Sequence, residues 1–173
     1  WKIEAAGKID ADIAVTKDDE FPDLPRFGVR MFLDKKLSAV RYFGMGPQES
    51  YCDKHQAASH GLYQANVDDL HEDYIRPQEN GSHYDCEYVE LNNSRYGIVV
   101  SAENAFSFNA SYYTQEELEE KTHNYELTES DSVVFCVDYA LNGIGSNSCG
   151  PVVLEQYRFD DVLFRFQFTL IPY

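Results

Sequence analysis

The chain has 173 residues and a formal net charge of −16 at pH 7, from 30 acidic and 14 basic side chains. A surface this acidic repels phosphate groups, so we expect neither nucleic acids nor anionic membranes as partners. No apolar run approaches the roughly 20 residues of a membrane-spanning helix, and the length suits a single domain with a sizeable core.

The first third of the chain predicts strands separated by polar turns. Residues 9–15 alternate between apolar and polar side chains, which is the period-two pattern of a half-buried strand. The runs 28–33 and 37–43 follow, and the short polar segment between them predicts that they pair as a hairpin. Residues 53–58 favour a single helical turn.

The rest of the chain predicts further strands and one helix. Five runs alternate in polarity or are rich in β-branched and aromatic residues, and we expect a strand at each: 84–91, 97–102, 105–110, 133–139 and 164–170. The helix is expected near residues 115–121, because Thr114 followed by Glu117 is a capping pattern that satisfies free N–H groups of a first turn. Many short strands and one helix predict an all-β architecture of two packed antiparallel sheets.

The four cysteines and five histidines give no indication of a metal site. No two cysteines have Cys-x-x-Cys spacing, and no two histidines have the i, i+4 spacing of a helical zinc site. Four cysteines are also too few for a disulfide scaffold in a chain of this length. We therefore expect free thiols in a reducing cytoplasm.

The tripeptide Pro-Gln-Glu occurs twice, at residues 47–49 and 77–79, each time beside residues that favour a turn. Each copy places a carboxylate, Glu49 or Glu79, on an ordered loop. Two such carboxylates are compatible with glycoside hydrolysis, which uses a pair of Asp or Glu residues across the scissile bond. The stronger interpretation is structural, with each carboxylate accepting backbone amides or pairing with a nearby base.

Five segments, in order along nearly the whole chain, resemble the signature stretches of the C-terminal domain of large multi-domain β-galactosidases: 24–28, 44–54, 74–81, 113–118 and 143–151. The resemblance implies an antiparallel super-sandwich of the galactose-mutarotase type, formed by residues 1–173 as a single domain. It also implies that the chain is part of an enzyme that hydrolyses terminal β-galactosides such as lactose. The start at Trp1, inside an alternating pattern and without a leader, is typical of an excised fragment.

The resemblance also assigns roles to residues. In the family, the two catalytic glutamates and the essential metal ions lie in a central barrel domain, so no catalytic residue, metal site or cofactor is expected in this chain. Glu49, Glu79 and Arg26 are expected to anchor loops. The segment 143–151 is expected to shape the leaving-group subsite, where one version of the family places a tryptophan that stacks on the sugar. This chain offers hydrogen-bonding candidates there instead: Ser146, Asn147, Ser148 and Cys149.

The partners that the resemblance implies are the remainder of the parent polypeptide and a galactoside substrate, in a parent that forms homo-oligomers. Two other functions stay open on the residues alone. One is a free-standing carbohydrate-binding module, which would bind sugar without the barrel. The other is a mutarotase-like enzyme, for which His83 and the nearby Asp85 are candidate catalytic groups.

Overall fold

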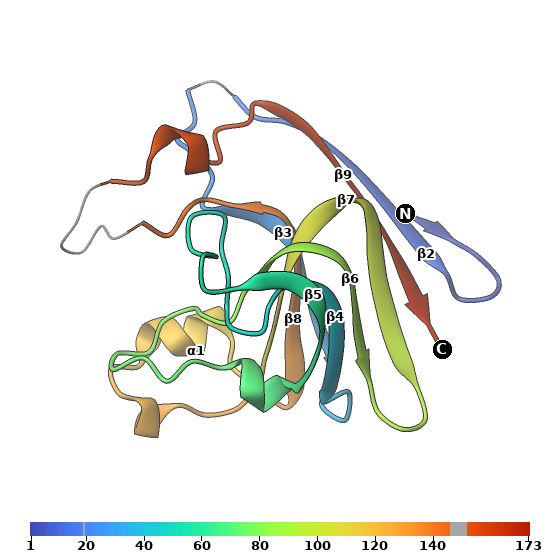
Figure 1. Ribbon diagram of the computed structural model, residues 1–173. Coiled ribbons are helices and arrows are strands. Elements are labelled where there is room, and N and C mark those ends of the chain that lie inside the picture. Colours follow the sequence, from blue (N-terminus) through green and yellow to red (C-terminus); the bar gives the residue numbers. More distant parts are fainter. Residues whose placement is uncertain (19, 146–151) are drawn as a thin grey trace.

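Figure 1 shows the computed structural model of the protein, which describes residues 1–18, 20–145 and 152–173. Within these ranges the chain forms nine strands, one α-helix and three short 3-10 helices, which confirms the predicted all-β class. The strands are β1 (Lys2–Ile3), β2 (Ile9–Thr16), β3 (Arg26–Asp34), β4 (Ala39–Gly46), β5 (Ser59–Asn66), β6 (His83–Asn92), β7 (Gly97–Ser111), β8 (Ser132–Leu141) and β9 (Leu163–Pro172). The helices are α1 (Gln115–Glu120), η1 (Val67–Leu70), η2 (Asn124–Glu126) and η3 (Glu155–Tyr157).

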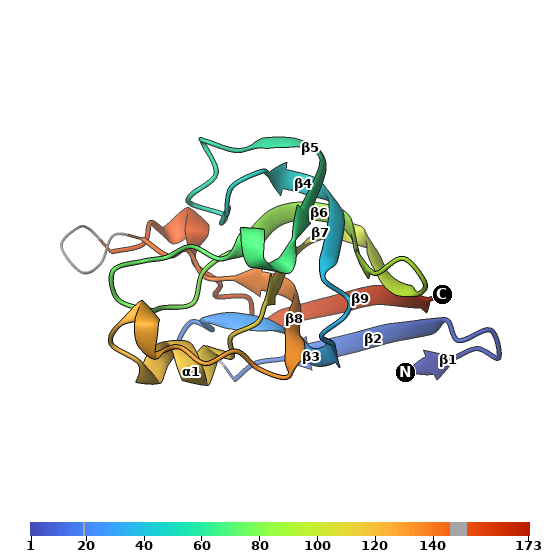
Figure 2. The same cartoon turned by 90° about the horizontal axis from the view of Figure 1, so that it is seen from below.

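The long strand β7 holds the sheet together. One of its edges pairs with β6, and β4 and β5 continue the sheet on that side. Its other edge is divided, because residues 98–101 pair with β9 and residues 107–111 pair with β8. The sheet continues from β9 to β2 and β1, and from β8 to β3, with every pair antiparallel. Beyond β7 the sheet therefore separates into two wings, and Figure 2 shows β2 and β9 side by side in one of them.

The core is a single cluster of buried side chains that includes residues of both wings and of the central strands. In β8, all six residues from Val133 to Asp138 are buried, as predicted for a strand covered on both faces. In β9, Phe164, Phe166 and Phe168 are buried and alternate with exposed residues, also as predicted. Burial of each such aromatic side chain stabilises the fold by roughly 1.5–3 kcal/mol, so β9 fixes its wing onto the core.

The helix α1 begins as the capping pattern predicts, since the side chain of Thr114 accepts a hydrogen bond from the backbone N–H of Glu117 at 3.1 Å. The helix ends at Glu120, and Leu118 is its buried residue. In the part of the chain that the structure describes, no helix is long and apolar enough to cross a membrane.

Two predictions about the strands are wrong. The runs 28–33 and 37–43 do not form a hairpin, because β3 pairs with β8 and both edges of β4 are occupied by β5 and β6. The runs 97–102 and 105–110 are not separate strands. They belong to the continuous β7, whose exposed residues Glu103 and Asn104 stay extended between its two differently paired halves.

The segment between β4 and β6 also differs from the prediction. Residues 53–58 form turns rather than a helical turn, since the backbones of Tyr51 and Lys54 bond to each other in both directions. Strand β5 was not predicted, although Gly61, Tyr63 and Ala65 form its inner face. A glycine and polar neighbours weaken the alternation that would have revealed it.

Candidate functional site

The described parts of the five signature segments gather at one end of the sheet, on the left of Figure 1. Three loops lie within these segments: the first loop is residues 47–54, which follow β4, the second loop is residues 74–81, and the glycine–serine loop is residues 143–151. The structure describes the glycine–serine loop as far as Gly145. Hydrogen bonds and ion pairs between side chains and backbones far apart in the sequence join these segments.

Glu49 connects the first loop to the second. Its side chain is only 5% exposed and accepts hydrogen bonds from Lys54 Nζ, from the Tyr74 hydroxyl and, at 2.8 Å, from the backbone N–H of Gly81. The Tyr51 hydroxyl donates a fourth bond at 3.2 Å. Burial by itself would raise the pKa of Glu49, but these donors outweigh burial and hold the pKa below its usual value. Glu49 is therefore a buried, ionised carboxylate whose oxygens are satisfied.

Arg26 connects β3 to β8 and to the second loop. Its Nη2 atom lies 2.8 Å from the Asp138 carboxylate, which is 2% exposed, and its Nη1 atom pairs with Glu79. Burial raises the pKa of Asp138 to about 6, although Arg26 acts in the opposite direction. Glu79 also accepts a bond of 3.4 Å from Gln115 of α1. The Arg26 guanidinium thus joins three segments of the chain, and Glu79 links them to α1.

A cavity of about 450 Å³ lies over this ion-pair cluster and reaches the start of the glycine–serine loop. Its wall includes Arg26, Glu79, Gln115, Asp138, Asn142 and Ile144. The wall also contains Cys136, but burial raises the pKa of this thiol to about 11, so it is protonated and a poor nucleophile. Because the charged groups of the wall are already paired, Arg26 with Asp138 and Glu79 and Arg30 with Glu116, the cavity is suited to binding and support rather than to bond cleavage.

Asp53 of the first loop fixes the start of the glycine–serine loop. Its Oδ1 atom accepts a bond from the backbone N–H of Ile144 at 3.1 Å, and its Oδ2 atom accepts one from Gly145 at 2.7 Å. Asp53 is not among the site residues predicted from the sequence. A possible signal was its place in the same signature stretch as Glu49, but its partners lie 91 and 92 positions away.

The predicted substrate-binding residues Ser146, Asn147, Ser148 and Cys149 lie outside the described residues. The described part of the glycine–serine loop contributes Gly143, which is buried, and Ile144 and Gly145, which are exposed. The substrate-binding role of residues 146–149 therefore stays a prediction from the resemblance.

The sequence matches the family described as "Beta galactosidase small chain" over residues 1–170. The chain belongs to this β-galactosidase small-chain family. The β-galactosidase of Actinobacillus pleuropneumoniae is 51% identical over 171 residues, which are 99% of this chain. The β-galactosidases of Staphylococcus xylosus and Kluyveromyces lactis are 38% and 32% identical over 170 and 168 residues. The small-chain domain spans only 16–17% of the length of these three curated relatives.

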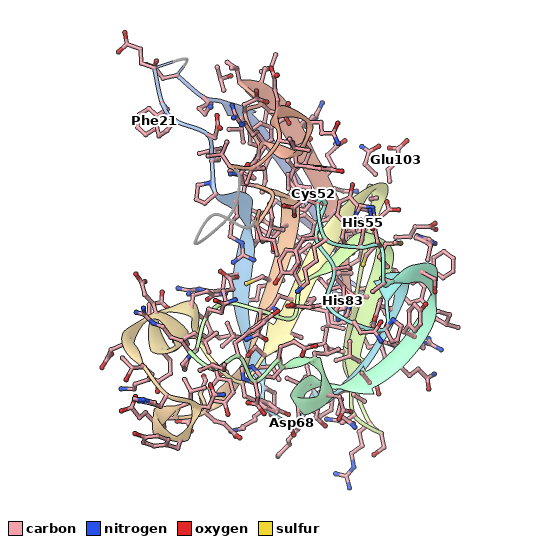
Figure 3. The ribbon with its side chains drawn as sticks, turned by 60° about the vertical axis from the view of Figure 1, so that its left-hand side comes forward. Phe21, Cys52, His55, Asp68, His83 and Glu103 are labelled. Atoms are coloured by element: carbon pink, nitrogen blue, oxygen red, sulfur yellow. The ribbon has the colours of Figure 1, made fainter. Side chains whose placement is uncertain are left out.

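The structure does not bring His83 and Asp85 together as the candidate mutarotase pair, because no hydrogen bond or ion pair joins their side chains. His83 is 1% exposed, and its ring packs against the rings of Tyr42 and Phe108, at centroid distances of 4.5 and 5.0 Å. Its Nδ1 atom contacts the carbonyl oxygen of Met45 at 3.3 Å, and its Nε2 atom has no hydrogen-bond partner among the described residues. Figure 3 labels His83, which lies within the molecule and away from its edge.

Acid should destabilise the small-chain domain through His83. Burial lowers its pKa from 6.5 to about 4, so between these pH values the unfolded chain binds a proton there that the folded chain does not bind. The free energy of unfolding should therefore fall as the pH falls, by up to roughly 3 kcal/mol. The measurement is urea unfolding at pH 7 and pH 4.5, for the original chain and for His83→Phe, which keeps an aromatic ring.

The His83→Phe variant should lose less stability on acidification than the original chain. Asp138 changes the free energy of unfolding in the opposite direction. Its pKa is raised to about 6, so its contribution to stability is largest in acid and becomes smaller as the pH rises. The variant keeps Asp138, so the difference between the two chains isolates His83. An equal acid sensitivity of the two chains would show that His83 is not its source.

The small-chain domain shows no metal centre in the residues described. Within residues 1–18, 20–145 and 152–173, no three or more His, Cys, Asp or Glu side chains lie close enough together to hold a metal ion. The carboxylates of this region that are buried, Glu49 and Asp138, are each engaged by a cation instead. These two ion pairs hold the loops in place.

Proposed function

We propose that the chain is the C-terminal domain of a β-galactosidase that hydrolyses terminal β-galactosides such as lactose. The observation that carries this proposal is the 51% identity between nearly the whole chain and one stretch of the Actinobacillus pleuropneumoniae β-galactosidase. The domain contributes no catalytic residue. The catalytic glutamates and the metal ions belong to the remainder of the polypeptide, which is the partner of this domain.

The role of the domain in the enzyme is to cover one side of the barrel active site and to shape the leaving-group subsite. Two features support this role: the described parts of the five signature segments converge on one end of the sheet, and the glycine–serine loop starts there. Within that loop, four side chains are the candidate contacts of the leaving group: Ser146, Asn147, Ser148 and Cys149. Their hydroxyl, amide and thiol groups suit the polar contacts of a sugar.

The enzyme is expected to be a cytoplasmic homo-oligomer. Support for the compartment comes from Cys52, Cys86 and Cys136, which are free thiols, as expected in a reducing environment. The oligomeric state follows from the family resemblance and is measured by light scattering of the complete protein.

The complete polypeptide that contains this chain should hydrolyse lactose and nitrophenyl β-galactoside, and the isolated chain should hydrolyse neither. The physical reason is that Glu49 is occupied by four donors and Glu79 is paired with Arg26, so neither is free to act as the acid or the nucleophile. The measurement is the rate of galactose release by equal molar amounts of the two proteins.

Hydrolysis by the isolated chain, or none by the complete polypeptide, would contradict the proposal. Saturable binding of galactose by the isolated chain, without hydrolysis by either protein, would instead indicate a carbohydrate-binding module. Accelerated interconversion of galactose anomers by the isolated chain would indicate a mutarotase-like enzyme.

A further inference from the structure

A second cavity, of about 560 Å³, opens where the edge of β7 divides between β8 and β9. Figure 1 shows these two strands diverging from β7. Residues 98–101 pair with β9 and residues 107–111 pair with β8, so the described stretch between them has no strand partner on this edge. The wall is formed by the first loop, β6, β7, β8, η3 and β9. A cavity of this size is typical of a small-molecule site.

Irregular backbone on two neighbouring strands shapes this cavity. Between two of their paired positions, β6 contributes Glu87 alone, whereas β7 contributes residues 102–105. Asp85 of β6, which lies in the wall, has a φ of +55°, in the left-handed region that residues other than glycine seldom adopt. Its carbonyl oxygen lies 3.0 Å from His60 Nε2 of β5. Bulges and left-handed residues redirect side chains out of the regular sheet, and they are common beside binding sites.

Two tyrosine rings in the wall are packed against other rings. Tyr84 of β6 stacks on His55 at a centroid distance of 5.5 Å. Tyr139 of β8 stacks on Phe164 at 4.7 Å. Both tyrosines are half-buried, so part of each side chain is open to the cavity. An aromatic face held in this way suits a sugar ring, whose C–H groups form an apolar patch.

The wall also presents polar groups with few partners. Ser107 is only 5% exposed, and neither its hydroxyl nor the Asn104 amide makes a hydrogen bond to another described residue. The Arg158 guanidinium donates from Nε to the carbonyl oxygen of Val153 at 3.3 Å, which leaves its Nη atoms for a ligand. With the Asp85 carboxylate, the wall offers both donors and acceptors to the hydroxyl groups of a sugar.

The charges of the wall indicate a neutral ligand. Two carboxylates, Asp85 and Asp161, line the cavity together with two guanidinium groups, Arg158 and Arg165. Arg165 is already bound through its Nε atom to Asp12 at 2.6 Å. The chain as a whole carries a net charge of −16 and repels anions. Neither an anion nor a cation would therefore find an excess of opposite charge in this cavity.

We propose that this cavity binds a neutral saccharide of one or two rings. Tyr84 supplies an aromatic face for the sugar, and Asn104 and Ser107 supply hydrogen-bonding groups. This inference goes beyond the proposed function and does not depend on it, because binding in the cavity requires no hydrolysis.

The test uses the complete polypeptide that contains this chain, with two neutral probes, galactose and cellobiose. Exchange of backbone amide hydrogens, followed by mass spectrometry of fragments, should slow in the segments 82–86, 102–107 and 156–161 when either sugar is added. The slowing should saturate as the sugar concentration rises. Galacturonate has the size of galactose but carries a negative charge, and it should not slow exchange in these segments.

Two variants remove groups of the wall. Tyr84→Ala should raise the half-saturating sugar concentration about tenfold, because the aromatic face is lost. Asn104→Ala changes an exposed residue and spares the core, and it should raise this concentration about fivefold, as expected for one hydrogen bond. The matched control is Tyr125→Ala. Tyr125 also stacks on a histidine, His123, at 5.1 Å, but it is 83% exposed and lies outside the wall. The control should leave the half-saturating concentration unchanged.

Saturable slowing by galactose and cellobiose that both wall variants weaken, and the control does not, supports the proposal. No slowing by either sugar overturns it, since another part of the polypeptide would then fill the cavity or the cavity would not bind sugar. Equal weakening by all three variants, or slowing by galacturonate as strong as by galactose, also overturns it. A polypeptide that binds sugar in this cavity but does not hydrolyse lactose would support this proposal and contradict the proposed function.

Discussion

Replacement of Arg26 by methionine should lower the free energy of unfolding by about 3–5 kcal/mol, because it leaves a buried carboxylate without its cation. Asp138 is 2% exposed and Arg26 Nη2 lies 2.8 Å from it, so the change removes the cation from a carboxylate that has little contact with water. Glu79 would lose its partner at the same time. The measurement is urea unfolding at pH 8, followed by circular dichroism.

The pH provides a second check on Arg26→Met. Protonation of Asp138 removes the unpaired charge, and its pKa of about 6 would be raised further without Arg26. The loss of stability relative to the original chain should therefore be smaller at pH 5 than at pH 8.

Arg30→Met is the matched control for Arg26→Met. Arg30 also lies on β3 and pairs with a carboxylate at 2.9 Å, that of Glu116, but the two side chains are 38% and 68% exposed. An exposed pair of this kind contributes little, because water screens it and its side chains lose entropy on pairing. The control should unfold close to the midpoint of the original chain. Equal losses for the two arginines would contradict the role assigned to the buried pair.

Gly28→Ala should lower the free energy of unfolding by about 3 kcal/mol, at the upper end of what overpacking costs. A Cβ atom at this position would lie 2.1 Å from Asp138 Oδ1 and 2.5 Å from the carbonyl oxygen of Val137. The second contact is with backbone, so β8 itself would have to move. The register between β3 and β8 shifts between Phe27 and Gly28, at the point where β3 passes this carboxylate. The measurement is again urea unfolding.

Gly61→Ala is the control for this substitution. Gly61 lies on β5, which like β3 is at an edge of the sheet, and the nearest atom to an added Cβ would be the Tyr63 hydroxyl at an ordinary 3.4 Å. Alanine restricts the unfolded chain more than glycine does, so this change should be neutral or slightly stabilising. A destabilisation of Gly61→Ala as large as that of Gly28→Ala would show that loss of a strand glycine, rather than the contact with β8, is responsible.

The strands that could be predicted from the sequence are those in which apolar and polar residues alternate along a short run. Residues 9–15 and 164–170 place larger apolar side chains at every second position because one face of each strand is buried, and both strands are present. Strand pairing is not local. Nothing in residues 28–33 indicates that their partner is β8, about a hundred positions later, rather than the neighbouring run 37–43.

The candidate site shows the same limit. The resemblance identified Glu49, Glu79 and Arg26, but neither Asp138, 112 positions from Arg26, nor Asp53 could be assigned a partner from spacing. Asp138 lies within the run 133–139, which was interpreted as a covered strand, and a single carboxylate in an apolar run was a usable signal. A buried carboxylate requires a partner, and Arg26 is that partner.

The pairing of β2 with β9 determines how late the chain can complete this wing of the sheet. Strand β2, near the start, pairs with β9, which is near the end, and contacts such as Asp12 to Arg165 span 153 positions. During synthesis, the edge of β2 that pairs with β9 therefore stays unpaired until almost the entire domain has been translated. Closure of so long a segment is slow, and a strand edge left open meanwhile is prone to self-association. We therefore expect the nascent chain to depend on chaperones until β2 has paired with β9.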